Sequence, residues 1–316
     1  MFNYIVRRIF IAIPILLGIT VIDFLIVNMA PGNPVDMMVS PNLTGAALAA
    51  RKAALGLNQP LYVQYYHWLG NILHLDFGYS MTTYQPVGQM LAQRIGPTML
   101  LMGVSLLAGL LIAVPLGIVS ATHQNSALDY LATGGAFFGV SIPNFFLGLG
   151  LIYIFAVKLR VLPSSGMFTL GGSNGFADTA AHLVLPAIVL AVQIAGQDIR
   201  YVRSGMLEIL GQDYLRTARA KGLRESVVIN RHALRNALTT IITVVGMQIP
   251  MLFGGAVITE QIFAWPGIGQ LTIDSISGRD YPTLMAINLI AAVIVLLANL
   301  LTDIMYSVVD PRVKYS

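Results

Sequence analysis

Long runs of apolar residues without charge recur along this chain, and most of them extend over 20 residues or more. Because a helix needs about 20 apolar residues to cross the hydrocarbon core of a bilayer, each run predicts a membrane span. Backbone groups in lipid must be satisfied within the segment, so the spans are expected to be helices. The predicted spans are 9–30 (apolar apart from Asp23), 98–122, 130–157, 180–197 (somewhat short), 237–259 and 281–302. The pattern therefore predicts an all-α polytopic membrane protein with six transmembrane helices.

Lysine and arginine are distributed unequally between the two sides of these spans. If both termini are cytoplasmic, twelve of the 18 basic residues lie inside, eight of them between Arg200 and Arg235. Basic residues resist translocation, so this orientation is favoured. The first run is too long for a cleaved signal peptide and no small-x-small cleavage site follows it, which predicts an uncleaved first span.

The connections between the predicted spans differ in size. Residues 31–97 form a large extracytoplasmic insertion with an aromatic stretch around Tyr65, typical of short helices at a membrane interface. Residues 158–179 and 263–282 form smaller outer loops, and only 206–236 gives the inner side a substantial structure. We find no internal repeat, so residues 1–316 are interpreted as one transmembrane domain.

Composition narrows the chemistry. Charged residues make up 10% of the chain, against about 25% in soluble domains. There is no cysteine, and the five histidines include no His-x-x-x-His pair, so we expect neither disulfides nor a metal site. The chain has no Gly-x-x-x-x-Gly-Lys-[Ser/Thr] loop, so we expect no ATPase site and no enzymatic activity of its own. The net charge of +4 follows from the inner loops and does not indicate nucleic-acid binding.

The inner loop reads as a helix, a glycine turn and a second helix. Asp213 is suited to cap the first helix. Leu215 and Ala218, three residues apart, are expected to share one face. Gly222 occupies the position after the helix that usually becomes left-handed. The second helix is expected to begin near Ser226.

This loop predicts a small apolar knob ringed with positive charge, which suits the groove of a partner protein. The alternative is an ordinary positive-inside loop lying on anionic lipid. The glycine stop and the small side chains of Ala218 and Ala220 favour a protein partner, because they permit close approach.

Thr217-Ala-Arg-Ala-Lys-Gly222 resembles the Glu-Ala-Ala-x-x-x-Gly loop of ABC-transporter permeases. Arg216 replaces the glutamate, and Leu234-Arg235 replaces a Leu-Pro pair. Both departures are typical of the dipeptide/oligopeptide/nickel branch of that family. Further motifs of that branch occur in the same order: Pro31-Gly-Asn-Pro34, Leu75-Asp-Phe-Gly-Tyr-Ser80, Glu260-x-Ile-Phe-x-Trp-Pro-Gly-Ile-Gly269, Arg279-Asp-Tyr-Pro282 and Asp310-Pro311. The chain resembles the first, B-type permease of a peptide importer.

The resemblance implies a type I importer fold in a bacterial cytoplasmic (inner) membrane. It implies two ABC ATPase subunits, a second homologous permease and an extracytoplasmic substrate-binding protein as partners, in a lipid membrane. It places ATP and Mg on the ATPase subunits, with no cofactor in this chain. The implied ATPase-coupling residues are Asp213, Tyr214, Leu215, Arg216, Thr217, Ala218, Arg219, Ala220, Lys221 and Gly222.

The sequence leaves open several substrates and one other class of transporter. Di- or oligopeptides are the first interpretation, and glutathione or nickel are alternatives within the same machinery. An ion-gradient-driven secondary transporter is the alternative from another class. It usually shows inverted repeats and acids at the midplane of the membrane, and we find neither in the sequence.

Four residues within or at the ends of the spans are candidates for a translocation path: the polar Gln248, Glu260 and Asn144, and Met251, which offers adaptable apolar surface. Gln248 lies beside Pro250, where packing of small residues is the alternative to a polar passage. Glu260 either contacts the substrate or the delivery protein, or is a structural carboxylate held by a neighbouring loop. Asp23 is expected near the outer boundary in a hydrogen-bonded structural role.

The turn that follows Glu260 is a candidate gate or receptor contact. It contains Phe263, Trp265 and Pro266, and Trp-Pro-Gly is favourable turn chemistry. Trp265 is also a candidate anchor at the membrane interface. A turn with only a structural role is the alternative.

Overall fold

The computed structural model describes residues 2–29, 58–172 and 175–309, without the side chains of 2–5, 238, 240, 251–255 and 306–309. The chain divides into two compact units. One contains residues 97–269 and 297–316, and the other contains residues 2–96 and 270–296. Secondary structure in the described part is helical apart from one isolated bridge between Tyr79 and Pro86.

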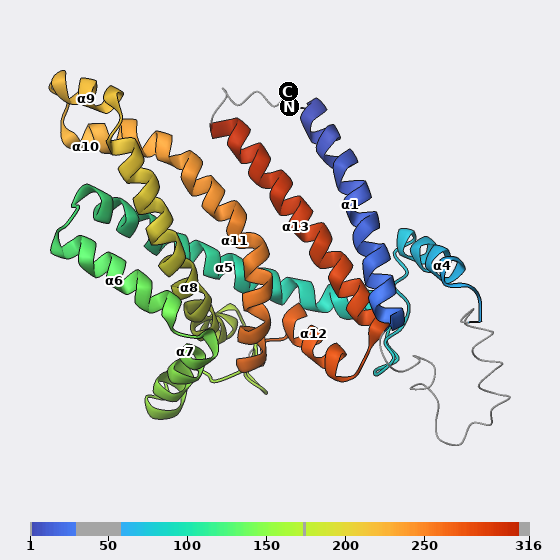
Figure 1. The fold of residues 1–316 in the computed structure, drawn as a ribbon. Helices are drawn as coiled ribbons and strands as arrows, with labels where there is room; N and C mark the ends of the chain where they lie inside the picture. The colour runs from blue at the N-terminus through green and yellow to red at the C-terminus, as the bar shows by residue number, and fades with distance from the viewer. Residues whose placement is uncertain (1, 30–57, 173–174, 310–316) are drawn as a thin grey trace. The chain divides into compact units, whose positions relative to one another are not determined.

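Figure 1 shows the helices and their labels. In chain order they are α1 (Phe2–Met29), α4 (Leu61–Leu73), α5 (Val87–Thr122), α6 (Ala127–Ser141), α7 (Asn144–Leu151), the π-helical segment η1 (Ile152–Lys158), α8 (Phe176–Leu210), α9 (Asp213–Ala220), α10 (Glu225–Val227), the π-helical segment η2 (Val228–Ala233), α11 (Leu234–Ile262), α12 (Ile268–Ser277) and α13 (Tyr281–Val309).

Four described helices are long and apolar enough to cross a membrane: Val6–Met29, Val87–Thr122, Phe176–Leu210 and Tyr281–Met305. These confirm the predicted spans at 9–30, 98–122, 180–197 and 281–302, although α5 and α8 are much longer than predicted. In α11, where a further span was predicted, Ile241–Pro250 qualifies only as a shorter apolar helix. Six spans therefore remain a prediction.

The predicted span 130–157 is not one straight helix. It consists of α6 followed by α7 and η1, and the two halves are bent by 97°. Pro143 lacks a backbone N–H and forces the preceding residue out of the helical region. Ile142 accordingly has φ −81° and ψ 124°. Together the two halves form either a broken span or a re-entrant loop, so the described helices account for four or five of the predicted spans.

In the unit of residues 2–96 and 270–296, α4 packs on α1 through the predicted aromatic stretch. The hydroxyl groups of Thr20 and Tyr65 lie 3.0 Å apart. The ring of Phe24 lies 5.5 Å from that of Tyr65 and 5.9 Å from that of Trp68, between centroids. Asp23 in the same turns of α1 accepts a 2.8 Å hydrogen bond from Asn288. This partner confirms its hydrogen-bonded role.

Asp280 joins two of the motifs that lie far apart in the sequence. The hydroxyl of Ser80 donates to its carboxylate at 2.5 Å, the N–H of Met81 at 3.0 Å and the hydroxyl of Thr283 at 2.7 Å. A carboxylate with this many donors fixes the loop around Ser80 against the start of α13. The Ser80 and Asp280 motifs therefore form one structural joint.

Candidate functional site

The inner loop folds much as its sequence predicts. It begins with α9, and the chain turns at Gly222, whose φ of +76° confirms the left-handed position. Asp213 is not the cap, however, because Gln212 occupies that position and no side chain caps the helix. Asp213 is the first helical residue, where its negative charge still suits the positive end of the helix dipole.

The apolar face of α9 is directed into the chain. Leu215 is fully buried and Ala218 is 8% exposed. They pack in one cluster with residues of α5, α8, η2 and α11: Ala121, Val202, Met206, Val228, Ala233 and Ala237. The expectation that Ala218 offers a partner close approach is therefore wrong, because this chain already covers it. The predicted second helix begins at Glu225 and continues as η2.

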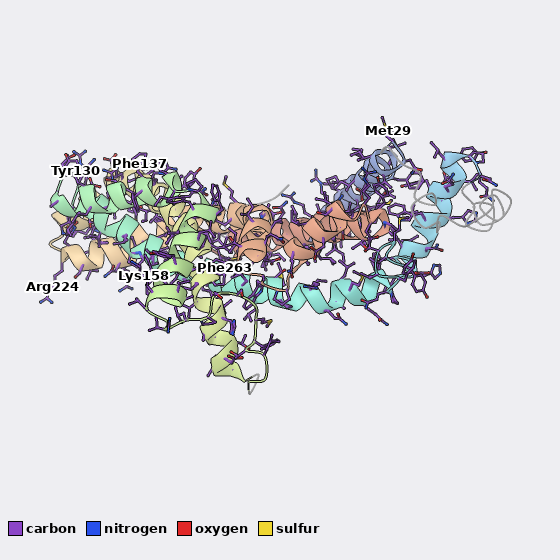
Figure 2. All side chains as sticks on the ribbon, turned by 90° about the horizontal axis from the view of Figure 1, so that it is seen from below. Met29, Tyr130, Phe137, Lys158, Arg224 and Phe263 are labelled. Atoms are coloured by element: carbon purple, nitrogen blue, oxygen red, sulfur yellow. The ribbon has the colours of Figure 1, made fainter. Side chains whose placement is uncertain are left out.

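The other face of α9 is exposed. Asp213, Tyr214, Arg216, Thr217, Arg219, Ala220, Lys221 and Gly222 all lie on the surface. The side chain of Arg216 is 78% exposed. Arg224 in the same loop is also exposed, and Figure 2 labels it. We call the exposed residues of 213–224 the coupling surface.

Two polar contacts close the loop on itself. Arg219 Nη2 lies 2.9 Å from Glu225 Oε1, on opposite sides of the Gly222 turn. These hydrogen bonds lower the pKa of the Glu225 carboxyl, so the pair is ionised at neutral pH. Asn236 donates a 2.8 Å hydrogen bond to the hydroxyl of Tyr214. Arg219 and Tyr214 of α9 are thus each held by a residue from the segment that follows the Gly222 turn.

Two of the path candidates meet α8. Asn144 donates a 2.6 Å hydrogen bond to Gln193 Oε1, and Gln248 donates a 3.4 Å hydrogen bond to Gln197 Oε1. Residues four apart lie on one helix face, so Gln193 and Gln197 form a row of amides. The structure therefore brings Asn144 and Gln248 to one polar face of α8. The side chain of Met251 lies outside the described residues.

Asp198, the next residue of α8, shares the side chain of Gln248 with this row of amides. It is fully buried, and its Oδ1 accepts a 2.6 Å hydrogen bond from Gln248. Its Oδ2 meets no hydrogen-bond donor in the described part of the chain. The sequence reading ended the fourth span at Gln197, whereas α8 continues to Leu210, so Asp198 is an intrahelical acid that this reading missed.

Glu260 is buried within the chain. Its Oε1 accepts a 2.7 Å hydrogen bond from Thr98, and its Oε2 accepts a 2.7 Å hydrogen bond from the N–H of Gly269. Thr98 in turn accepts a hydrogen bond from the N–H of Ile268 at 2.8 Å. We call Thr98, Glu260 and residues 265–269 the turn lock. This geometry supports the structural alternative for Glu260.

Two residues of the candidate gate, Trp265 and Pro266, belong to the turn lock, and Phe263 precedes it. Phe263 is 2% exposed and Trp265 is fully buried, whereas Pro266 is half-buried. Trp265 Nε1 donates a 2.9 Å hydrogen bond to the carbonyl of Pro97. The expectation that Trp265 anchors at the membrane interface is wrong in this structure, because the indole packs inside its own unit. The arrangement supports the structural-turn alternative.

The partners of Asn144 and Gln248 on α8 are detectable in the sequence by their spacing. Gln193 and Gln197 are two amides at helical spacing within an apolar run, which predicts a polar face. Asp129 and Arg203 also pair, although 74 residues separate them. No spacing in the sequence indicates such a pair.

Comparison with known families gives matches over most of the chain. The family profile described as "Binding-protein-dependent transport system inner membrane component" matches residues 113–315. A second profile, for the N-terminal part of such membrane components, matches residues 1–102.

Individual relatives cover the full length. The chain is 46% identical over 313 residues to the oligopeptide transport system permease protein AppB of Bacillus subtilis, covering 99% of each chain. It is 37% identical over 315 residues to the glutathione transport system permease protein GsiC of Salmonella typhimurium, covering 100% of each. A solved structure of the MetNI methionine ABC transporter, inward facing, matches with a TM-score of 0.59 and 19% identity. It covers 70% of this chain and 97% of that chain, which is a likeness of fold.

Proposed function

Because the chain belongs to the family of binding-protein-dependent transport system inner membrane components, we propose that it is a permease subunit of an ATP-driven oligopeptide importer. The observation that carries the peptide substrate is the 46% identity to an oligopeptide permease over 99% of both chains. Glutathione is the second candidate, favoured by the full-length match to a glutathione permease. Nickel has no such match among the relatives named above.

The proposal includes a topology. Six helices cross the cytoplasmic membrane, the sixth being α11, and both termini are cytoplasmic. Residues 31–97 form the extracytoplasmic insertion, and 206–236 form the cytoplasmic coupling loop. The family description supports an extracytoplasmic binding protein and a membrane location. One further homologous permease and two ATPase subunits complete the proposed assembly, and ATP is hydrolysed on the ATPase subunits.

The coupling surface is proposed to receive the ATPase subunits. Its exposed cations and the exposed side chain of Tyr214 suit a groove in a partner, and the buried Leu215 ties the helix to α5 and α8. When ATP closes the ATPase pair, the loop moves with it and the spans tilt to open a central cavity outward. This is a two-state change biased by a ligand on the partner.

The polar face of α8 is proposed to line the translocation path. Amide side chains both donate and accept hydrogen bonds, as the peptide backbone does, so they suit peptides of many sequences. In this structure Gln193 and Gln197 bond to Asn144 and Gln248 instead. Separation of α7 and α11 from α8 would free them for the substrate.

Uptake by the whole transporter tests the function. The chain is reconstituted in proteoliposomes with its ATPase subunits, sister permease and binding protein. We expect uptake of a labelled oligopeptide that requires ATP and persists when ion gradients are collapsed. Unlabelled peptides should compete, and glutathione and Ni²⁺ should not. Uptake that depends on an ion gradient and not on ATP would refute the proposed importer. If glutathione competes and unlabelled peptides do not, glutathione and not an oligopeptide is the substrate.

Replacing Gln193 by leucine tests the path. The change keeps the size of the side chain but removes the amide, so uptake should fall about tenfold, the order expected for losing one or two hydrogen bonds to substrate. The matched control is Gln261→Leu, the same change at an exposed position near the end of α11. Equal uptake by the two variants at equal amounts in the membrane would exclude Gln193 from the path.

A further inference from the structure

Asp129 collects hydrogen bonds from three elements. Arg203 of α8 donates to it twice, Nε to Oδ1 at 2.8 Å and Nη2 to Oδ2 at 2.8 Å. Ser120 of α5 donates to Oδ1, and the N–H of Asn125 in the α5–α6 turn donates to Oδ2 at 3.0 Å. Asp129 lies in the first turn of α6, and its side chain is 5% exposed. A bidentate pair of this kind fixes orientation as well as distance.

This ion pair lies beside the buried cluster on which the coupling loop packs. Val202 and Met206, the neighbours of Arg203 on α8, are in the cluster that holds Leu215 and Ala218. A β-carbon on Gly117 of α5 would collide with the side chain of Val202, so α5 and α8 approach closely here. The same turns of α8 thus carry α9 on one side and α6 on the other.

Small residues continue the contact between α6 and α8 toward the break at Pro143. A β-carbon on Gly196 would lie 2.8 Å from the carbonyl of Ala136, and one on Gly139 would lie 3.1 Å from the carbonyl of Val192. Ala136 is 1% exposed. These contacts allow close packing but contain no hydrogen-bonding side chain, so the directional, hydrogen-bonded contact that the structure describes between these two helices is the Asp129–Arg203 pair.

We propose that Arg203 and Asp129 are positioning residues that make α6 follow α8 when the coupling loop moves. Motion received by α9 passes through its buried face into α8, and the ion pair carries α6 along as part of the same body. The far end of α6 leads through the bend to Asn144, whose hydrogen bond to Gln193 belongs to the polar face. This inference rests on the proposed function and adds the residues that transmit the motion.

The first test measures peptide transported per ATP hydrolysed by the complete transporter. Asp129→Asn keeps the shape of the side chain and removes its charge, so the ratio should fall about tenfold, a usual size for coupling between two sites. The matched control is Arg200→Gln, because Arg200 also connects α8 with α6, but only through its exposed contact with the ring of Phe137 at 5.5 Å. Figure 2 labels Phe137 and Tyr130 on α6. The control should keep the wild-type ratio.

The second test follows the motion itself. The chain contains no cysteine, so spin labels can be placed only where cysteines are introduced. Leu131 on α6 is 72% exposed, and Asn230 in the inner loop is also exposed. The distance between labels at these positions should be the same in the nucleotide-free and ATP-trapped transporter, and should differ between the two states in Asp129→Asn.

The outcomes separate this inference from the function on which it rests. ATP-driven uptake by the wild type with an unchanged ratio in Asp129→Asn would sink the positioning role and leave the importer standing. A distance between the labels at positions 131 and 230 that changes with nucleotide in the wild type would also refute the positioning role and leave the importer standing. If Asp129→Asn fails to assemble, Arg203→Lys keeps the positive charge but cannot make the bidentate contact with Asp129, and it should lower the ratio by a smaller factor. A wild-type ratio in Arg203→Lys would then overturn the proposal.

Discussion

Transport is expected to stop when residues 214–223 are deleted, while the chain remains inserted in the membrane. The deletion removes most of the coupling surface, so the energy of ATP hydrolysis no longer reaches the spans. It also removes Leu215 and Ala218 from their buried cluster, which loosens the packing of α5 and α8 around that cluster. Uptake in proteoliposomes and protease protection of the inserted chain measure the two effects. Normal uptake by the deletion variant would refute the coupling role.

A point substitution separates docking from packing. Arg216 is 78% exposed, and its 3.6 Å ion pair with Asp213 is also exposed, so it contributes little to stability and Arg216→Glu should leave the fold unchanged. Reversing a charge on a cationic docking surface should weaken ATPase binding by about tenfold or more. Lys158→Glu is the matched control, because Lys158, labelled in Figure 2, is also exposed and lies outside the inner loop. Its ammonium group lies 5.1 Å from the ring of Tyr153. Equal loss of ATPase binding in both variants would indicate a general effect of charge.

The turn lock should be highly sensitive to Gly267→Ala. A β-carbon at Gly267 would collide with the Glu260 carboxylate, which is fully buried and held by two hydrogen bonds. Overpacking of this kind costs about 1–3 kcal/mol, and the broken hydrogen bonds add to it. We expect a clearly lower thermal unfolding midpoint for the purified chain in detergent. Gly150→Ala is the control, because a β-carbon at Gly150 meets nothing within 4 Å.

Glu260→Gln distinguishes the two interpretations of that residue. The amide keeps the acceptor for Thr98 but turns an N–H₂ toward the N–H of Gly269, so two donors face each other. A buried unsatisfied donor costs about 1–3 kcal/mol, and the unfolding midpoint should fall. If instead stability is unchanged and only peptide uptake falls, Glu260 acts on the substrate and the lock is the wrong description.

The span pattern was readable from the sequence because it depends on composition over about 20 residues, and a bilayer imposes one length on every span. Four of the six predicted runs are long apolar helices in the structure. The bend at Pro143 was also legible in principle, since a proline displaces the residue before it. What the pattern did not reveal was how far each helix continues beyond the apolar run. The extension of α8 to Leu210 placed Asp198 and Arg203 inside a helix.

Within the coupling loop, some features follow from the local sequence and others depend on tertiary packing. The helix, its apolar face and the left-handed Gly222 follow from local rules of spacing and backbone geometry. Whether that face meets a partner or the chain itself depends on what lies beside it. The structure places Met206 and Ala121 there, which reverses the role expected for Ala218.

By itself, the sequence determined the membrane class, the glycine turn after α9 and the position of each polar residue along its helix, because these properties depend on near neighbours in the chain. Only the tertiary structure decided which polar groups meet. Thr98 reaches Glu260, Arg203 reaches Asp129, and Asn144 reaches Gln193. Such partners are separated by dozens of residues, and buried polar groups take whichever partner the packing of helices brings within about 3 Å.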